Sequence, residues 1–257
     1  GLGDVYKRQL RREYMPMHNN SLESLQQQNT QLNKKVKTLE HLLQSSLNIG
    51  EQITSNHLQK LFLNLKEEKL IKNYAIYNNI IVENEEEIHQ VDHFVICDHG
   101  FFAIETKHWK GDIYFNFHKD NLKDYNLDGL KKYLFTDNDD SYMTFILCNE
   151  NNQFQFKKYG HPFQQVMKST TFCQSVLKTD FIENIIYFNH RGEGELFVGN
   201  AYKYVETPSS EQELSTIIRK KIQRNKSRKN MDSATIMSHC ETLNKFANND
   251  ATIINIH

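Results

Sequence analysis

The sequence predicts an α/β fold, and three observations lead to that prediction. Short runs rich in β-branched and aromatic residues occupy positions 75–82, 91–97 and 101–107, which is typical of strands. Helical patterns lie on both sides of these runs, at about 49–69 and 162–178. The chain of 257 residues has room for one such domain with appendages, and its 16 Phe and 12 Tyr residues supply a core.

The first 47 residues are expected to lie outside this domain. Residues 1–16 read as a leader, and residues 1–9 resemble the translation of a sequencing adapter, so we exclude them from the fold. This interpretation leaves the native start open, with Met15, Met17 or an upstream residue as candidates.

Residues 17–47 are predicted to form a coiled coil. Apolar residues and one asparagine recur alternately three and four positions apart, with no Gly or Pro between them. These heptad positions are Leu22, Leu25, Asn29, Leu32, Val36, Leu39 and Leu43. A single Asn at such a position favours a parallel dimer, so a second copy of the chain is an expected partner. The alternative is one long amphipathic helix that packs on its own domain.

The remaining elements follow from turn signals and apolar patterns. An acidic run at 83–87 precedes a central hairpin, and a polar insertion at 121–140 follows it, with a short helix at about 127–134. Further strands are expected at 111–117, 143–147, 154–156, 185–188 and 195–198. A capping box at 210–213 begins another helix, and the segment from Met231 is expected to be helical at first and then irregular. We therefore expect one domain at 48–205 and a helical, basic tail at 206–257.

Three charged residues lie in the apolar strands of the central hairpin. Asp92, Glu105 and Lys107 should be buried there, which is costly unless they are paired or hold a metal. The turn is expected at His99-Gly100. A two-residue loop pairs Asp92 with Lys107, and a four-residue loop pairs it with Glu105. Either register places all three on one face of the sheet, whereas an unbulged three-residue loop would move Asp92 to the other face.

This arrangement suits metal-assisted chemistry. Two carboxylates at the ends of adjacent strands are hard oxygen ligands of the kind that Mg²⁺ prefers. A neighbouring lysine can orient or help to deprotonate a water, or stabilise developing charge, as phosphodiester hydrolysis requires. On spacing alone, the alternative is a structural Asp/Glu–Lys cluster.

The region around the hairpin resembles the nuclease-related domain (NERD) family, a branch of the PD-(D/E)xK nuclease superfamily. The central signature is present as Asp92-His93, Gly100, Ile104-Glu105-Thr106-Lys107, Trp109 and Lys110-Gly111. Two outlying motifs also match, Gly50-Glu51 ahead of the first strand and Pro162-x-x-Gln165 after the sheet. The departures are Val91 for the usual Ile, His108 for the usual Asn, and His161 for the Asn that precedes the proline.

The resemblance implies a restriction-endonuclease-like core, a mixed β-sheet flanked by helices, and a nuclease that uses Mg²⁺, or Mn²⁺, in DNA processing or defence. Asp92, Glu105 and Glu51 would bind the metal, Lys107 would assist the water, and Gln165 would support the site. DNA would be the partner, with RNA as an alternative and no small-molecule cofactor. From the residues themselves, Glu51 is alternatively a first-turn glutamate favoured by the helix dipole, and Gln165 a surface residue. The alternative function is a catalytically idle nucleic-acid-binding or scaffold module.

Charge and composition bound the remaining possibilities. A net charge of −1 argues against a generic, salt-driven nucleic-acid binder, although residues 219–229 are strongly basic. Candidate nucleic-acid contacts are Lys110, Arg219, Lys220, Lys221 and Arg224. The alternative for the basic run is a solvated helix end. Similarly, Lys110 is expected to be solvated, and Trp109 to pack beside the site.

Metal sites of other types and membrane insertion are not indicated. The 12 His residues form no ligand cluster, so a zinc site is not expected. The four cysteines lack CxxC spacing and indicate a reduced cytoplasmic protein. No apolar run is long enough to span a membrane. The alternative location is a membrane tether through residues upstream of this sequence, beside the pair Arg11-Arg12.

Overall fold

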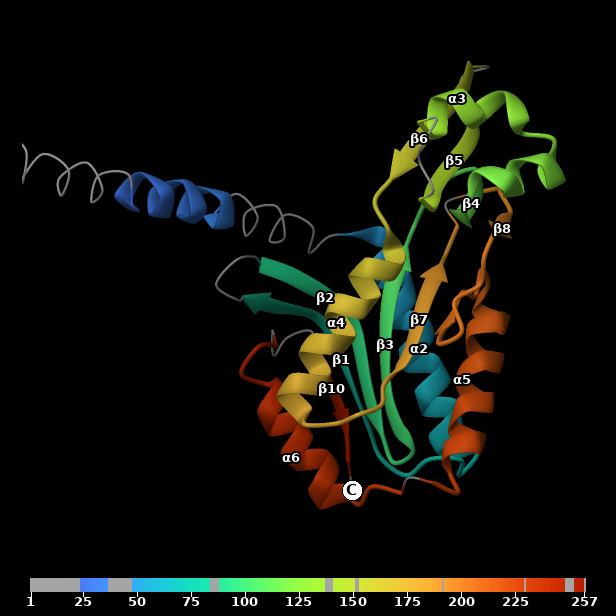
Figure 1. Cartoon of the computed structure of the whole chain (residues 1–257). Coiled ribbons are helices and arrows are strands. Elements are labelled where there is room, and N and C mark those ends of the chain that lie inside the picture. Colours follow the sequence, from blue (N-terminus) through green and yellow to red (C-terminus); the bar gives the residue numbers. More distant parts are fainter. Residues whose placement is uncertain are drawn as a thin grey trace, which may run out of the picture. The chain divides into compact units, whose positions relative to one another are not determined.

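The structure is a computed structural model of the chain, shown in Figure 1. It describes residues 24–36, 48–83, 88–136, 141–150, 153–190, 192–228, 230–247 and 252–256. The chain divides into two compact units, one of residues 1–46 with 83–89 and one of residues 47–82 with 90–257. The predicted leader and most of the predicted coiled coil lie outside the described residues.

In the first unit, residues 24–36 form a helix. Leu25, Leu32 and Val36 are exposed along it, by 63%, 61% and 43%. Asn29 lies on the same heptad stripe, and its Oδ1 accepts a hydrogen bond of 2.9 Å from Asn33 Nδ2. The helix is confirmed over these residues, and the coiled coil remains a prediction.

The second unit is built on a six-stranded mixed sheet with the strand order β10-β1-β2-β3-β7-β9. Strands β2 and β3 are antiparallel, whereas β7 runs parallel to β3 on its other side. The strands are β1 (Tyr74–Glu83), β2 (Ile88–Cys97), β3 (Gly100–Lys107), β7 (Glu183–Phe188), β9 (Val205–Glu206) and β10 (Thr252–Asn255). The predicted α/β fold, a mixed sheet flanked by helices, is confirmed.

Helices cover both faces of this sheet (Figure 1). On one face, α2 (Ile49–Glu67) and α5 (Glu211–Asn225) pack on the side chains of Phe102 and Ile104. On the other face, α4 (Pro162–Leu177) and α6 (Ser233–Leu243) pack on Phe101 and Ala103. Side chains alternate between the two faces along a strand, so Glu105 and Lys107 belong to the α4 face, at the end of β3.

A second, four-stranded sheet of order β6-β5-β4-β8 follows the hairpin. Together with the short helices between its strands, we call it the insertion lobe. Its elements are β4 (Asp112–Phe117), η1 (Lys119–Tyr125), η2 (Asp128–Leu130), α3 (Lys131–Leu134), β5 (Met143–Glu150), β6 (Gln153–Tyr159) and β8 (Leu196–Val198). The lobe has its own aromatic core, in which Tyr114 stacks on Phe145 with ring centroids 4.8 Å apart. In Figure 1 the lobe lies beyond the ends at which β3 and β7 finish.

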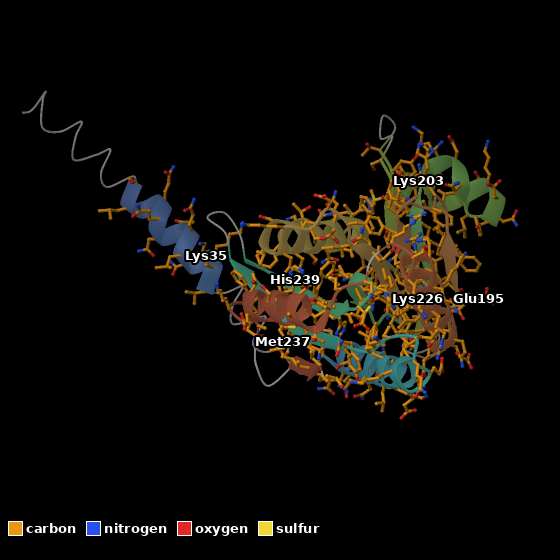
Figure 2. All side chains as sticks on the ribbon, turned by 90° about the horizontal axis from the view of Figure 1, so that it is seen from below. Lys35, Glu195, Lys203, Lys226, Met237 and His239 are labelled. Carbon is orange, nitrogen blue, oxygen red and sulfur yellow. The ribbon has the colours of Figure 1, made fainter. Side chains whose placement is uncertain are left out.

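The C-terminal residues are part of the main core, which the expectation of a tail did not include. Leu214, Ile218 and Ile222 of α5 recur every four residues and are buried against α2 and the sheet. On the opposite face, His239 of α6, which Figure 2 labels, packs edge-on against Phe101, with ring centroids 5.2 Å apart. The last segment was expected to be irregular, but β10 pairs antiparallel with β1. The described part of residues 206–257 therefore completes the sheet and covers both of its faces.

The predicted start of α5 is confirmed, and one of the two hydrogen bonds of its capping box is present. Ser210 Oγ accepts a hydrogen bond of 3.2 Å from the backbone N–H of Glu213. The Glu213 carboxylate accepts from the N–H of Ser209 at 2.7 Å, one residue before the cap position that a full capping box would use.

Candidate active site

The hairpin turn fixes which charged residues face each other. Cys97 pairs with Gly100, so the turn residues are Asp98 and His99, one position earlier than the predicted His99-Gly100. Continued by one residue from the pair of His93 with Ile104, the register places Asp92 opposite Glu105. The sequence allowed this pairing with a four-residue loop, whereas the structure reaches it with a two-residue loop one position earlier, and the register keeps Asp92, Glu105 and Lys107 on one face.

These three residues lie close together and are largely buried. Asp92 is 8% exposed and Glu105 4%. The Lys107 ammonium donates to Glu105 Oε1 at 2.5 Å, and its side chain is 12% exposed. Asp92 Oδ2 accepts a hydrogen bond of 2.8 Å from the backbone N–H of Thr106. The cluster therefore contains two carboxylates and one ammonium in a mostly apolar setting.

Helix α2 adds a third carboxylate from its first turn. Glu51 is 8% exposed, and its Oε1 accepts a hydrogen bond of 2.8 Å from Asn48 Nδ2. The amide of Gln90 links it to the hairpin, with Nε2 3.1 Å from Glu51 Oε2 and 3.5 Å from Asp92 Oδ1. The same Nε2 donates to Asn79 Oδ1 at 2.7 Å. The Gly-Glu motif is thus joined to the acids of the hairpin through Gln90.

Burial and mutual repulsion perturb all of these charges. Burial, followed by the charge of Asp92, raises the pKa of Glu51 to about 8 and that of Glu105 to about 7. Burial also raises the pKa of Asp92, against the opposing effects of Lys107 and the Thr106 N–H. For Lys107, burial disfavours the ammonium, but Glu105 and Asp92 outweigh it and raise the pKa. Three acids share one cation, which is the charge balance of a cation-binding site.

The metal-free protein is therefore expected to lose stability as the pH rises. Glu51 and Glu105 bind protons more tightly in the folded chain than in the unfolded chain, where the pKa of a glutamate is about 4.3. Their stabilising contribution is fully present below about pH 4 and is lost as the pH rises through about 7 and about 8. Thermal midpoints measured with a chelator from pH 5.5 to 8.5 test this. The Glu51→Gln/Glu105→Gln variant should flatten the fall, and an unchanged slope would contradict the assignment.

A buried asparagine fixes the position of α2 relative to the strand ends. Asn189 follows β7 and is 6% exposed. Its Nδ2 donates to the Gly50 carbonyl at 2.7 Å and to Thr54 Oγ1 at 2.9 Å. His108 Nδ1 lies 2.7 Å from the Asn189 carbonyl, which can only accept, so Nδ1 carries the proton in this contact. Asn189 thus connects the start of α2 to the segment after β3.

Sequence reasoning did not identify Asn48, Gln90 and Asn189 as part of the site. Gln90 lies two residues before Asp92, on the same face of β2, and Asn189 directly follows the apolar strand β7. Polar residues at the ends of buried strands are the signal that could have identified both of them.

Gln165, the remaining predicted site residue, lies near the start of α4. Its side chain is exposed, and its backbone donates from N–H to the His161 carbonyl at 3.4 Å and accepts from Ser169 Oγ at 3.2 Å. The helix turns Val166, one residue further on, toward the sheet. This exposure favours the alternative of a surface residue, and a supporting role of Gln165 in the site stays a prediction.

Most of the predicted nucleic-acid contacts on α5 are engaged within the protein. Arg219 pairs with Glu68, and Arg224 pairs with the buried carboxylate of Glu183. Lys221 lies 3.2 Å from Glu183 and 2.7 Å from Glu206. Helix α5 also covers the α2 face of the sheet, whereas Asp92 and Glu105 lie on the α4 face. Three basic residues of the run thus pair with one buried acid, Glu183, and with two acids that are more exposed, Glu68 and Glu206. Lys220 is exposed, and so is Lys226, which Figure 2 labels.

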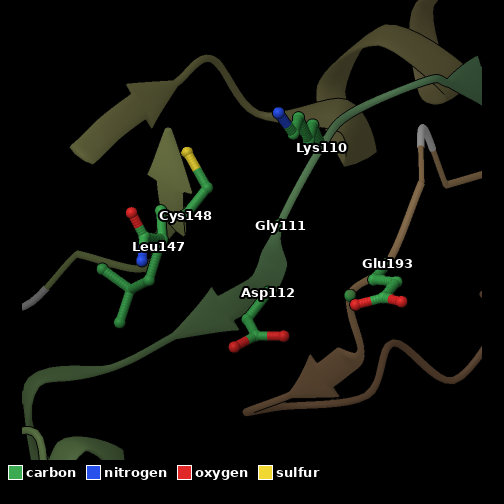
Figure 3. A pocket seen from close by; sticks show the side chains of 8 residues that line it. Lys110, Gly111, Asp112, Leu147, Cys148 and Glu193 are labelled. Carbon is green, nitrogen blue, oxygen red and sulfur yellow. The ribbon is translucent and has the colours of Figure 1, made fainter. Parts of the chain in front are cut away.

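The remaining predicted contact, Lys110, is exposed at the base of the insertion lobe. It lines an open cavity of about 440 Å³ (Figure 3). The other lining residues are Gly111, Asp112, Leu147, Cys148, Asn149, Glu193 and Gly194. Asp112 and Glu193 offset the charge of Lys110, so the cavity has no clear preference for an anion.

The acids fit a hard divalent cation as a pair rather than as a trio. Within the described ranges, no three His, Cys, Asp or Glu side chains are arranged to hold one metal ion. The hairpin register, continued by one residue, puts Asp92 beside Glu105, whereas both oxygens of Glu51 accept hydrogen bonds from amides. One or two carboxylates, completed by water and substrate phosphate, are a common Mg²⁺ site.

A mixed sheet flanked by helices, with an acidic pair and a lysine on one hairpin and a further acid on the preceding helix, defines a restriction-endonuclease-like α/β protein. Residues 46–189 match the nuclease-related domain (NERD), and the chain belongs to this family. The match is consistent with the PD-(D/E)xK superfamily and indicates a nuclease-related function. No curated protein and no solved structure significantly matches the chain. In the described part of the chain, no helix is long and apolar enough to cross a membrane.

Proposed function

We propose that this protein is a Mg²⁺-dependent nuclease that hydrolyses phosphodiester bonds in DNA. The observation that carries this proposal is the buried cluster of Asp92, Glu105 and Lys107, with Glu51 joined to it through Gln90. A purely structural cluster would be expected to balance its charges, whereas here three acids with raised pKa values share one ammonium.

Each side chain has a distinct part in this proposal. Asp92 and Glu105 would hold the cation, which acts as a Lewis acid and lowers the pKa of bound water. Lys107 would donate a hydrogen bond to the attacking water or to a phosphate oxygen as charge develops on it. Glu51 is separated from Asp92 by the Gln90 amide and would orient water or adjust the charge of the pair.

Cleavage assays with a Lys107 variant test the proposal. The panel contains supercoiled, linear, single-stranded and branched DNA and single-stranded RNA, each with Mg²⁺, Mn²⁺ or chelator. Wild type is expected to cleave at least one DNA with metal, and Lys107→Ala is expected to lose roughly 10²-fold or more of that rate. Lys157→Ala, on an exposed site of β6, is the control. Equal cleavage by wild type and Lys107→Ala would assign the activity to a contaminant or to another site. Cleavage of RNA alone would replace the proposed substrate.

A second candidate function is an idle binding or scaffold module. It is favoured by the direct contact between Lys107 and Glu105, which satisfies one acid without a metal. Calorimetric titration with Mg²⁺ separates the two functions. Binding that Asp92→Ala abolishes supports the nuclease, and no binding together with no cleavage supports the idle module.

We also propose that two copies of the chain associate through the predicted coiled coil. The exposed stripe of Leu25, Leu32 and Val36 supports this partner, and the polar Asn29 within it favours a parallel dimer. Light scattering should give the mass of a dimer for the full chain and of a monomer for Leu25→Glu/Leu32→Glu. Gln27→Glu, on the same helix but off the stripe, is the control, and a monomeric wild type would contradict the proposal.

The proposed location is the cytoplasm. The four cysteines are all free, and three of them, Cys97, Cys173 and Cys240, are buried. Reduced, buried thiols are typical of proteins in that compartment.

A further inference from the structure

The only tryptophan of the chain lies between the site lysine and the insertion lobe. Trp109 follows β3 in the segment that leads to β4, and the Lys107 ammonium lies 5.9 Å from the centroid of its ring. On the lobe side, the ring of Tyr159 stacks on Trp109 with centroids 4.3 Å apart and planes 24° apart. Phe188, at the end of β7, meets Trp109 at 6.0 Å and 60°.

We propose that Trp109, held in place by Tyr159, is a positioning residue for Lys107, so that the insertion lobe sets the place of the lysine. This proposal rests on the proposed nuclease function, because it gives Lys107 a position that matters for cleavage.

The first step of the argument is that Lys107 needs more than one contact to be fixed. A lysine side chain has four rotatable bonds and loses much rotamer freedom when it is held in one place. Glu105 holds the ammonium on one side. The face of Trp109 supplies a second attraction through its π-system, within the distance at which cation–π contacts act. Two contacts restrict the ammonium to the small range of positions that hydrolysis of a bound substrate requires.

The second step is that Trp109 cannot turn away. Tyr159 and Phe188 contact the indole from two different elements, β6 and β7. Tyr159 is itself fixed by the pairing of β6 with β5, where it lies opposite Thr144. The lobe core then holds β5 through Phe145, which stacks on Tyr114. A chain of packed rings and paired strands therefore runs from the insertion lobe to Lys107.

Kinetic comparison of ring-keeping and ring-removing variants tests this role. Trp109→Leu is expected to lower kcat roughly tenfold with little change in KM, as loss of a desolvated cation–π contact implies. Trp109→Phe keeps a ring and should retain most of kcat, and Tyr159→Leu should lower kcat whereas Tyr159→Phe should not. Tyr133→Leu, on an exposed site of α3, is the control. Folded Trp109→Leu protein with the kcat of wild type would overturn the proposal.

A fluorescence measurement tests the contact without any cleavage. Because Trp109 is the only tryptophan, the whole indole emission reports this place. Lys107→Met removes the ammonium near the ring and should change the emission maximum and lifetime, whereas Lys157→Met should change neither. Unchanged emission in Lys107→Met would overturn the proposal even if the wild type cleaves DNA. If Lys107→Met changes the emission but the wild type cleaves no nucleic acid, the contact is supported and only the proposed function is refuted.

Discussion

Asp92→Asn is expected to abolish metal-dependent cleavage and, at the same time, to stabilise the metal-free fold. Loss of a charged ligand removes several kcal/mol of the stabilisation that a metal gives to the transition state, which corresponds to roughly 10³-fold in rate. In the metal-free chain, burial raises the pKa of Glu51 and Glu105 most, and the same substitution removes the second cause, the charge of Asp92. At pH 8 the relief should be on the order of 1 kcal/mol, measured as a rise in the free energy of unfolding. Opposite changes in activity and stability are the signature of a functional carboxylate.

Asp98→Asn is the matched control for this experiment. Asp98 is also buried, 3% exposed, but it accepts hydrogen bonds from the N–H of Lys72 and from the N–H and side-chain amide of Asn73. An asparagine at position 98 replaces one acceptor with a donor, so it should destabilise the fold by about 1–3 kcal/mol and leave Mg²⁺ binding intact. If Asp92→Asn behaved in the same way, with stability lost and cleavage retained, Asp92 would be structural.

The same two aspartates show how far the sequence predicts the hairpin. Period-two alternation places Glu105 and Lys107 on one face of β3, and Asp92 of β2 joins them only if the turn has an even number of residues. The turn itself was predicted one residue too late. Its position depends on Asp98, whose hydrogen-bond donors at residues 72 and 73 lie in another part of the chain. Local pattern thus predicts the faces within each strand, whereas the turn, which a tertiary contact holds, decides how the two strands face each other.

The basic run at 219–229 shows why charge patterns are harder to interpret. Along the sequence it is a cluster of positive charges without an acid, which favours a nucleic-acid contact. In the fold, Glu183 and Glu68, which are distant in the sequence, lie beside this run. Glu183 forms ion pairs with Lys221 and Arg224, and Glu68 forms one with Arg219. The function of a charged helix depends on which acids face it, and periodicity does not contain that information.

For α2, too, the sequence predicts the local features but not the tertiary contacts. The Gly-Glu motif and the apolar spacing located the helix and its acid, but the contacts of Asn189 and Gln90 with this helix join residues far apart in the chain. For Gln165, the direction of the side chain depends on how α4 is rotated about its axis. A shift of one residue, to Val166, decides which side chain faces the sheet.

Gly50→Ala is expected to have the second large effect, because the structure has no room for a side chain at this position. A Cβ atom built on Gly50 would lie 2.2 Å from the Cβ of His108, which Asn189 holds in place from the other side. Overpacking of this kind should cost about 3 kcal/mol in the free energy of unfolding. The start of α2 must shift to relieve it, so Glu51 should move away from Gln90 and cleavage should fall by more than the loss of folded protein explains. Chemical denaturation and kcat at equal folded fraction measure the two effects.

Gly129→Ala and a double substitution decide whether the contact with His108 is the cause. A Cβ on Gly129 would meet no atom within 4 Å, so Gly129→Ala should change the stability by less than about 0.5 kcal/mol. His108→Gly removes the Cβ that the alanine would strike. In that background, Gly50→Ala should cost clearly less than it does in the wild type, a coupling that residues in contact show and distant residues do not. Equal costs in both backgrounds would mean that Gly50 is needed for the backbone of the helix start, and that His108 does not set the position of Glu51.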